Sequence, residues 1–293
     1  MAQISYPELA AAVSNAGGLG VMASGGWSAE QLRVNIRRCR ELTDKPFAVN
    51  LMLMRPNIAE LVDVLVEEGV GIVTTGAGTP KPYMPVLKKA GVLVVPVVPS
   101  VLLARKMEDI GADAVIAEGT EAGGHVGETT TMCLIPQVVD AVSLPVIAAG
   151  GIADGRGMAA VFALGAQGIQ MGTRFLMTRE CPAHEKYKQA ILAANDTATV
   201  VSGRRKGAPV RSLRNGMVED YLRLENDPAA TMEDLEYLAA GSLQRAACEG
   251  DIVNGSVMAG QIAGMIGTVM TCEEVINTII RDVREIGRTI AVP

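Results

Sequence analysis

Short apolar runs alternate with amphipathic stretches between residues 18 and 171 of the chain. Each run is almost continuously apolar and stops near a glycine, a proline or a short polar residue, as expected for a strand buried on both faces of a parallel sheet. We therefore predict seven parallel strands, at residues 18–23, 47–53, 71–75, 92–98, 114–118, 146–149 and 168–171.

The stretches between these runs place apolar side chains at helical spacing. They predict helices at residues 28–42, 57–68, 81–90, 100–110, 132–142 and 154–165. Asp154 is a suitable N-cap for the last of them. A further helix at residues 6–15 precedes the first strand, and Ser5 and Glu8 stand at capping-box spacing before it.

Regular alternation of strands and helices is typical of repeated βα units. Eight such units close a barrel, so seven strands behind a leading helix predict an α/β fold of the TIM-type (β/α)8 barrel without its first strand, which either lies upstream of Met1 or is absent. An open doubly wound sheet is the alternative. It is disfavoured because no G-x-G-x-x-G sequence follows the first strand.

The regular alternation ends after Gly172, and this break predicts the domain organisation. Residues 1–182 are expected to form a barrel, to which residues 253–293 return with a helix from about residue 272 to 288. Residues 183–252 carry helical patterns at 183–194 and 231–248 and are expected to form a small cap over the barrel mouth. Caps of this kind gate access to a site.

Composition and charge exclude several classes of function. The 293 residues are 49% hydrophobic and 20% charged, and no apolar run is long enough to cross a membrane. The five cysteines show no C-x-x-C spacing, so we expect reduced thiols and no metal site. A net charge of −6 argues against nucleic acid as a partner. No secretory leader is visible, which predicts a cytoplasmic protein.

One short segment departs from this acidic balance. Residues 204–214 hold five cations and no acid: Arg204, Arg205, Lys206, Arg211 and Arg214. A solvated loop and a docking patch are equally good interpretations of such a run.

Two glycine-containing turns follow the sixth and seventh predicted strands. Gly150 and Gly151 lie in AAGGIADG, and Gly172 and Thr173 lie in MGTRF. Counted with a missing first strand, these are the loops after strands seven and eight, where TIM-type barrels commonly bind phosphate. Backbone N–H groups and the Thr173 hydroxyl are suitable donors to a phosphate. The sequence thus predicts a phosphate-bearing cofactor, and two ordinary turns are the alternative.

His125 is one of only two histidines and lies among Gly123, Gly124 and Gly127 in EAGGHVGE. Glycines permit a close approach of the backbone, which favours a binding site over a packed core histidine. Other predicted strands end in short polar residues suited to a planar heterocycle, namely Asn50, Thr75, Ser100 and Glu118. Together these residues predict a polar lining at one end of the barrel.

The segments AEGTEAGGHVG, PVIAAGGIADG, GAQGIQMGTRF, NGSVMAGQIAG and LAAAVSNAGGLG closely resemble the FMN-dependent enoyl-acyl-carrier-protein reductase II family, which is sister to the nitronate monooxygenases. The resemblance extends over essentially the whole chain. It implies FMN with its phosphate on Gly150, Gly151, Gly172 and Thr173. It also implies that Asn50, Thr75, Glu118, Gly123 and Gly124 lie near the flavin and that His125 is the active-site histidine.

The resemblance further implies the reaction and its participants. NADH or NADPH would reduce FMN, which would reduce a trans-2-enoyl thioester of fatty-acid elongation, bound to acyl carrier protein or coenzyme A. His125 would orient the thioester carbonyl or donate the proton to Cα, because an imidazole changes charge near neutral pH. Acyl carrier proteins are acidic, so the run at residues 204–214 is the expected docking surface. A homodimer is also implied.

The sequence leaves two alternatives to this function open. A nitronate monooxygenase would use His125 to remove a proton next to a nitro group. A truncated, weakly flavin-binding chain without catalytic activity would follow from the absence of the first strand, since the family has a Gly-Gly-Met turn there with which Met1 aligns.

Overall fold

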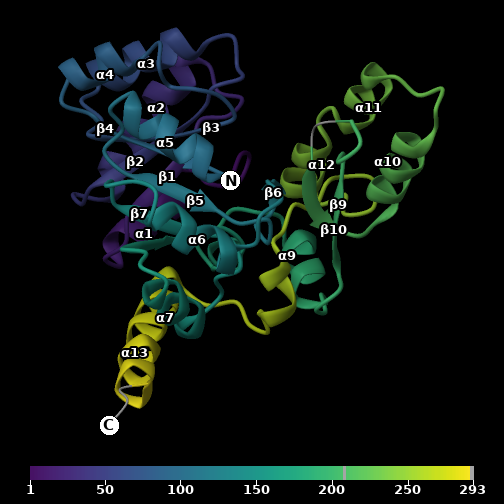
Figure 1. Ribbon diagram of the computed structural model, residues 1–293. Coiled ribbons are helices and arrows are strands. Elements are labelled where there is room, and N and C mark those ends of the chain that lie inside the picture. Colours follow the sequence, from purple (N-terminus) through teal and green to yellow (C-terminus); the bar gives the residue numbers. More distant parts are fainter. Residues whose placement is uncertain (207–208, 291–293) are drawn as a thin grey trace.

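Seven parallel strands form one curved sheet in the computed structural model, which describes residues 1–206 and 209–290 (Figure 1). Every predicted strand is confirmed. In spatial order they are β1 (Gly20–Ala23), β2 (Phe47–Met52), β3 (Ile72–Gly76), β4 (Leu93–Val98), β5 (Val115–Glu118), β7 (Val146–Ala149) and β8 (Gly168–Gln170).

The strand register aligns the polar residues that end the strands. Asn50 of β2 lies opposite Ala23 of β1 and Thr74 of β3, and Glu118 of β5 lies opposite Ala149 of β7. All of these pairs are parallel, so the carboxyl ends of the strands meet at one edge of the sheet. That edge is where ligands bind in α/β proteins.

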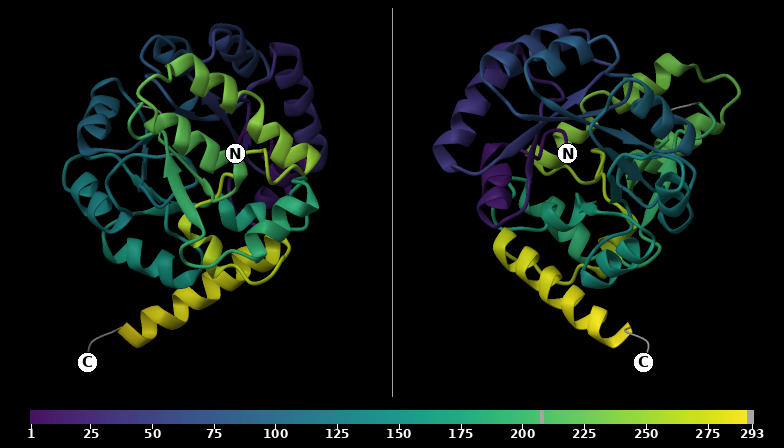
Figure 2. Two further views of the ribbon diagram at one scale, coloured as in Figure 1. Left: turned by 90° about the vertical axis from the view of Figure 1, so that its right-hand side faces the viewer. Right: turned by 60° about the vertical axis from the view of Figure 1, so that its left-hand side comes forward.

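Helices surround the curved sheet (Figure 2). Their bounds are within three residues of the prediction: α1 (Pro7–Asn15), α2 (Ala29–Leu42), α3 (Ile58–Glu67), α4 (Met84–Lys89), α5 (Val101–Asp109), α6 (Thr131–Val139) and α7 (Gly155–Ala163). Asp154 is confirmed as the N-cap of α7, where its side chain accepts hydrogen bonds from the backbone N–H groups of Arg156 and Gly157.

The capping box predicted for α1 is wrong. Tyr6 is the N-cap, and Pro7 opens the helix without a side-chain cap. Proline suits this position because the first helical N–H has no partner within the helix. The Ser5 hydroxyl instead donates to Val21 O at 2.6 Å and so ties the start of α1 to β1.

Residues 1–5 lie between the ends of β1 and β8. Ala23 N donates to Ser5 O at 3.0 Å, whereas Met1 Sδ lies 3.5 Å from the point that a Cβ on Gly172 would occupy. Among the described residues no hydrogen-bonded ladder joins β8 to β1. The sheet is therefore seven-stranded, and the predicted eight-stranded closure stays a prediction.

The segment 183–252 contains both helices and strands. Its elements are α9 (Glu185–Leu192), β9 (Thr199–Ser202), β10 (Val210–Leu213), α10 (Gly216–Asn226), α11 (Met232–Ala239) and α12 (Ser242–Glu249). The β9–β10 hairpin adds β6 (Gly124–His125) to form a three-stranded antiparallel sheet. Figure 1 shows this small sheet beside the helices of the segment. Sequence reasoning did not predict β6, the hairpin or α10.

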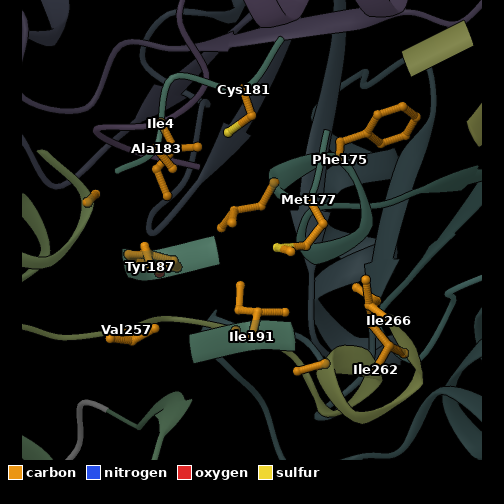
Figure 3. Packing of buried hydrophobic residues seen from close by; sticks show 14 of the residues in the cluster. Ile4, Phe175, Met177, Cys181, Ala183, Tyr187, Ile191, Val257, Ile262 and Ile266 are labelled. Atoms are coloured by element: carbon orange, nitrogen blue, oxygen red, sulfur yellow. The ribbon is translucent and has the colours of Figure 1, made fainter. Parts of the chain in front are cut away.

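One hydrophobic cluster packs this segment against both ends of the chain (Figure 3). Ile4 comes from the N-terminal segment, Tyr187 and Ile191 from α9, and Ile262 from the 3₁₀ helix η1 (Gln261–Met265). Tyr187 is fully buried, and its hydroxyl donates to Met258 O at 2.7 Å. This cluster includes residues from 1–182, 183–252 and 253–293. The division of the chain into a barrel and a cap stays a prediction.

The last helix, α13 (Cys272–Ile290), packs along α7 and projects beyond the rest of the molecule (Figure 2). The contact is close because Gly155 begins α7 there. A Cβ on Gly155 would lie 2.5 Å from Asp282 Cβ and 2.9 Å from Val283 N. The C-terminal helix thus packs on a helix of the βα series, and the predicted return of residues 253–293 to a barrel stays a prediction.

We expect Gly155→Ala to destabilise the protein, because the added methyl group pushes α13 away from α7. Overpacking of this kind costs about 1–3 kcal/mol, measurable by urea unfolding. Gly287→Ala on α13 is the control, since its Cβ would meet nothing within 4 Å and should add up to about 1 kcal/mol of helix stability. Equal unfolding free energies for the wild type and Gly155→Ala would contradict the close contact.

Candidate active site

The ends of β2 and β3 contribute amide and hydroxyl groups to the carboxyl edge of the sheet. Asn50 is half-buried, and its side-chain amide donates to Thr74 Oγ1 at 2.9 Å. Thr75 is 1% exposed, and its hydroxyl has no hydrogen-bond partner among the described residues. A buried hydroxyl without a partner is costly, so this atom indicates a place for a polar ligand.

Glu118 ends β5 as predicted, next to β7. Burial raises the pKa of its carboxyl to about 7, because the charged form loses its hydration. A carboxyl group in this state can hold or release a proton near neutral pH. Such a perturbed group at a strand end is typical of functional sites.

His125 lies on β6, seven residues after Glu118, opposite Val210 of β10. Its side chain is exposed, yet the surrounding protein partly desolvates it and lowers its pKa. The imidazole is therefore neutral at pH 7, with one nitrogen that donates and one that accepts a hydrogen bond. His125 is therefore not packed in the core, and its role in a binding site stays a prediction.

The two predicted phosphate turns follow the adjacent strands β7 and β8. Gly150 and Gly151 both have positive φ, at 87° and 70°, which glycine adopts without strain. Gly172 is the N-cap of the one-turn helix α8 (Thr173–Leu176), and the Thr173 hydroxyl accepts a hydrogen bond from Gly260 N at 2.9 Å. The structure thus places both turns at the same edge as Asn50 and Glu118.

Residues 119–123 and 259–260 lie between these turns. A Cβ on Gly150 would lie 2.8 Å from Gly119 O, and a Cβ on Gly123 would lie 2.6 Å from the carbonyl carbon of Ala259. The close approach that Gly123 permits is therefore to the chain's own backbone. Gly124 has a φ of 83°, and β6 begins there.

Sequence reasoning missed the side chains that hold this arrangement together. The Glu121 carboxylate accepts from the backbone N–H and the hydroxyl of Thr131, and Thr131 Oγ1 is also 3.1 Å from Gly150 O. Glu121 O accepts from Gln261 N at 2.9 Å. The Gly150 turn is thereby tied to the segment that carries His125. The only feature of the sequence that could have indicated this contact is the acidic residue Glu121 in EAGGH.

The cationic run does not form one continuous outward patch. Arg211 is 6% exposed and donates to Thr120 O, while Arg204 donates to the Thr120 hydroxyl at 3.2 Å. Arg214 pairs with Glu219 at 2.7 Å. Arg205 is exposed, and its backbone N–H donates to the buried carboxylate of Glu225 at 2.6 Å.

The residues present fit an FMN molecule at this edge. Gly150 and Gly151 have positive φ, Gly172 has a φ of −106°, and none of the three has a side chain that would cover backbone N–H groups suited to a phosphate. The partnerless hydroxyl of Thr75 and the buried carboxyl of Glu118 can hydrogen-bond a polar heterocycle. Within the described residues, no group of His, Cys, Asp and Glu is placed to hold a metal ion. No helix there is long and apolar enough to cross a membrane.

Comparisons with known proteins identify relatives over the whole length. The sequence profile described as nitronate monooxygenase matches residues 1–64 and 58–282. A (3aS,4S,5R,7aS)-5-hydroxy-7a-methyl-1-oxo-octahydro-1H-indene-4-carboxyl-CoA dehydrogenase of Rhodococcus jostii is 34% identical and covers 96% of this chain and 90% of its own. A probable nitronate monooxygenase of Staphylococcus saprophyticus is 38% identical over 74% of this chain and 75% of its own.

Two solved structures are also similar. FabK from Thermotoga maritima is 47% identical, covers 99% of this chain and 92% of its own, and superposes with a TM-score of 0.96. A nitroalkane oxidase from Streptomyces ansochromogenes is 31% identical over 99% of this chain and 96% of its own, with a TM-score of 0.88. The fold is therefore the TIM-type α/β fold of these proteins.

We expect the stability of the flavin-free protein to depend on the protonation of Glu118. A carboxyl whose pKa is raised on folding stabilises the folded state fully below its unfolded pKa of 4.5, and this contribution is lost as the pH rises through about 7. Glu118→Gln should therefore gain up to about 3 kcal/mol relative to wild type between pH 5 and pH 8. Urea unfolding at both pH values measures this difference.

The control for this comparison is Glu128→Gln, which changes an exposed carboxylate on the same loop. It should follow the wild type at both pH values. Parallel pH profiles for wild type and Glu118→Gln would show that the folded protein does not hold the Glu118 proton.

Proposed function

The chain belongs to the nitronate monooxygenase family, and we propose that it acts there as an FMN-dependent reductase of trans-2-enoyl thioesters with NADH or NADPH as the electron donor. Members of this family are flavin-dependent oxidoreductases. The observation that carries the proposal is the 47% identity to FabK over 99% of the chain, which includes residues 183–252. Identity to the nitroalkane oxidase over the same length is 31%.

In this proposal the sheet is the wall of a TIM-type barrel, and residues 183–252 cover its mouth. The turns at Gly150, Gly151, Gly172 and Thr173 would hold the phosphate of FMN. Asn50, Thr75, Glu118, Gly123 and Gly124 would line the heterocycle and its ribityl chain. When bound, FMN supplies the redox chemistry that connects the nicotinamide to the enoyl double bond.

His125 would act on the thioester beside the flavin. As a neutral imidazole it would donate a hydrogen bond to the thioester carbonyl, whose oxygen gains negative charge during reduction. In the alternative role, His125 would donate the proton that Cα requires. The position of His125 on a short strand, opposite Val210, would fix the direction of its ring.

Nitronate monooxygenase is the second candidate. The 38% identity to the probable nitronate monooxygenase of Staphylococcus saprophyticus favours it. In that reaction His125 would remove the proton next to the nitro group, so one position would serve either chemistry.

The thioester would be carried by acyl carrier protein or by coenzyme A. Arg204 and Arg205 are both exposed, but the Arg204 side chain donates to Thr120, Arg211 is buried and Arg214 is paired, so Arg205 is the best placed of these four to meet an acidic carrier. The Rhodococcus jostii relative is named for a CoA-linked substrate, which agrees with a thioester substrate.

The two enzyme activities are separated by their substrates. We expect purified, flavin-loaded protein to oxidise NADH rapidly with crotonyl-CoA in the absence of oxygen, and to turn over propyl nitronate in air only slowly. Rapid nitronate turnover with negligible thioester reduction would select the monooxygenase. Failure to retain FMN after incubation with excess FMN would support the non-catalytic alternative.

His125→Ala is the test of the active-site assignment within that assay. It should lower kcat by about 10²-fold or more while the FMN content stays unchanged. His184→Ala is the control, because it removes the other histidine of the chain, whose ring accepts a hydrogen bond from Lys186 N at the start of α9. Unchanged turnover in His125→Ala would reject the proposed role.

Docking is tested by Arg205→Glu. We expect the KM for crotonyl-ACP to rise several-fold, whereas turnover of crotonyl-N-acetylcysteamine should not change, because the small thioester has no carrier. Arg223→Glu makes the same charge change at an exposed position on α10 and should have little effect. Equal effects of Arg205→Glu on both substrates would reject this docking surface.

A further inference from the structure

The loop that carries His125 is closed at its base and weakly paired at its tip. Thr120 N donates to Thr129 O at 2.9 Å, which joins the two ends of the loop. The strand β6 in between has only two residues, and among the residues that the structure describes it pairs with β10 alone. A ladder of this length provides little stability of its own, so another contact must fix the loop.

Arg211 of β10 supplies one such contact, in addition to the hydrogen bonds that Glu121 accepts from Thr131 and Gln261. Its main chain lies opposite Gly124, next to His125, and its Nε donates to Thr120 O at 3.0 Å. Its Nη1 donates to Thr199 Oγ1 of β9 at 3.1 Å. One residue therefore contacts the loop both at its base and beside the histidine, and it is itself held by the neighbouring strand.

The chemistry of this contact is specific to arginine. The planar guanidinium directs N–H groups from two different nitrogens at acceptors on two different segments, in a fixed fork. A lysine ammonium also has several N–H groups, but they share one nitrogen and do not present this fork. Arg211 is only 6% exposed, and the acceptors of its Nε and Nη1 are a carbonyl and a hydroxyl. Burying a cation against neutral acceptors is expensive, so an apolar residue would suit a purely structural role on β10 better.

We propose that Arg211 is a positioning residue, which holds the loop 119–129 so that the His125 imidazole keeps one orientation at the carboxyl edge of the sheet. Arg211 hydrogen-bonds Thr120 O and pairs with Gly124 in the sheet, and it acts on His125 through these two residues. The proposal rests on the proposed role of His125 in catalysis. It is independent of whether the substrate is an enoyl thioester or a nitronate.

The chain offers a direct readout, because it contains only two histidines. In protein labelled with ¹³C and ¹⁵N at histidine, the ring signal missing from His125→Gln identifies His125, and the remaining signal is His184. We expect Arg211→Gln to shift and broaden the His125 signal while that of His184 stays in place. Arg211→Lys should give the same result if the two-acceptor geometry matters, and should restore the wild-type signal if charge alone matters.

Arg214→Gln is the matched control, since it removes an arginine that ends the same strand but pairs with Glu219 at the surface. Its His125 signal should equal that of the wild type. In turnover, Arg211→Gln should lower kcat by roughly 10- to 100-fold with little change in KM or FMN content. A purely structural role would instead lower FMN content and thermal stability together.

An unchanged His125 signal in folded Arg211→Gln would overturn the proposal, and so would restoration of that signal by Arg211→Lys. If Arg211→Gln does not fold, Thr199→Val decides, because it removes one acceptor and leaves the Thr120 contact. We then expect a smaller shift of the His125 signal in the same direction, and no shift would reject the role. The signal reports the orientation of the imidazole even if neither proposed substrate is turned over.

Discussion

The site depends on the parallel register that brings the carboxyl ends of β2, β3, β5, β7 and β8 to one edge of the sheet. Between β2, β3, β5 and β7, a shift in register would break the packing of buried side chains; the three residues of β8 are half-buried. Asn50, Thr75 and Glu118 are far apart in sequence but share this edge. The packing of apolar side chains, which take no part in the chemistry, thus determines where the polar groups meet.

The second level of organisation is the segment from Gly119 to Gly127, which leaves the sheet and joins β10. Glycines serve two purposes there. Gly123 lets the backbone of Ala259 approach closely, while Gly124 takes up a positive φ at the start of β6. His125 consequently belongs to a small antiparallel sheet and not to the parallel one. The large sheet places the lining, and the small sheet places the imidazole.

Much of the fold could be predicted from the sequence. The seven strands and the helices between them follow from apolar periodicity, since burial on both faces leaves a continuous signal. The Asp154 cap was predictable from local chemistry, whereas the capping box predicted at Ser5 was wrong, because the Ser5 hydroxyl bonds to β1 instead. That competition is set by tertiary structure and leaves no trace in the local pattern.

The limits are clearest for residues 183–252. β9 and β10 have four residues each, and β6 has two. Strands this short do not show an alternation of apolar and polar residues that would distinguish them from loops. Arg211 appeared as one of five cations in a run, whereas the structure buries it and leaves Arg205 exposed. Composition showed that charge gathers here, but only the strand pairing shows which cations face inward.

The hydrogen bond from Gly260 N to Thr173 Oγ1 has a consequence for folding order. It joins segments 87 residues apart, and residues 259–260 also pack against Gly123. Contacts of such long range form slowly, because a large loop must close before they are made. During synthesis on the ribosome, the contacts of residues 259–260 with Thr173 and Gly123 can therefore form only after residue 260 has emerged, when all seven strands of the large sheet have already been made.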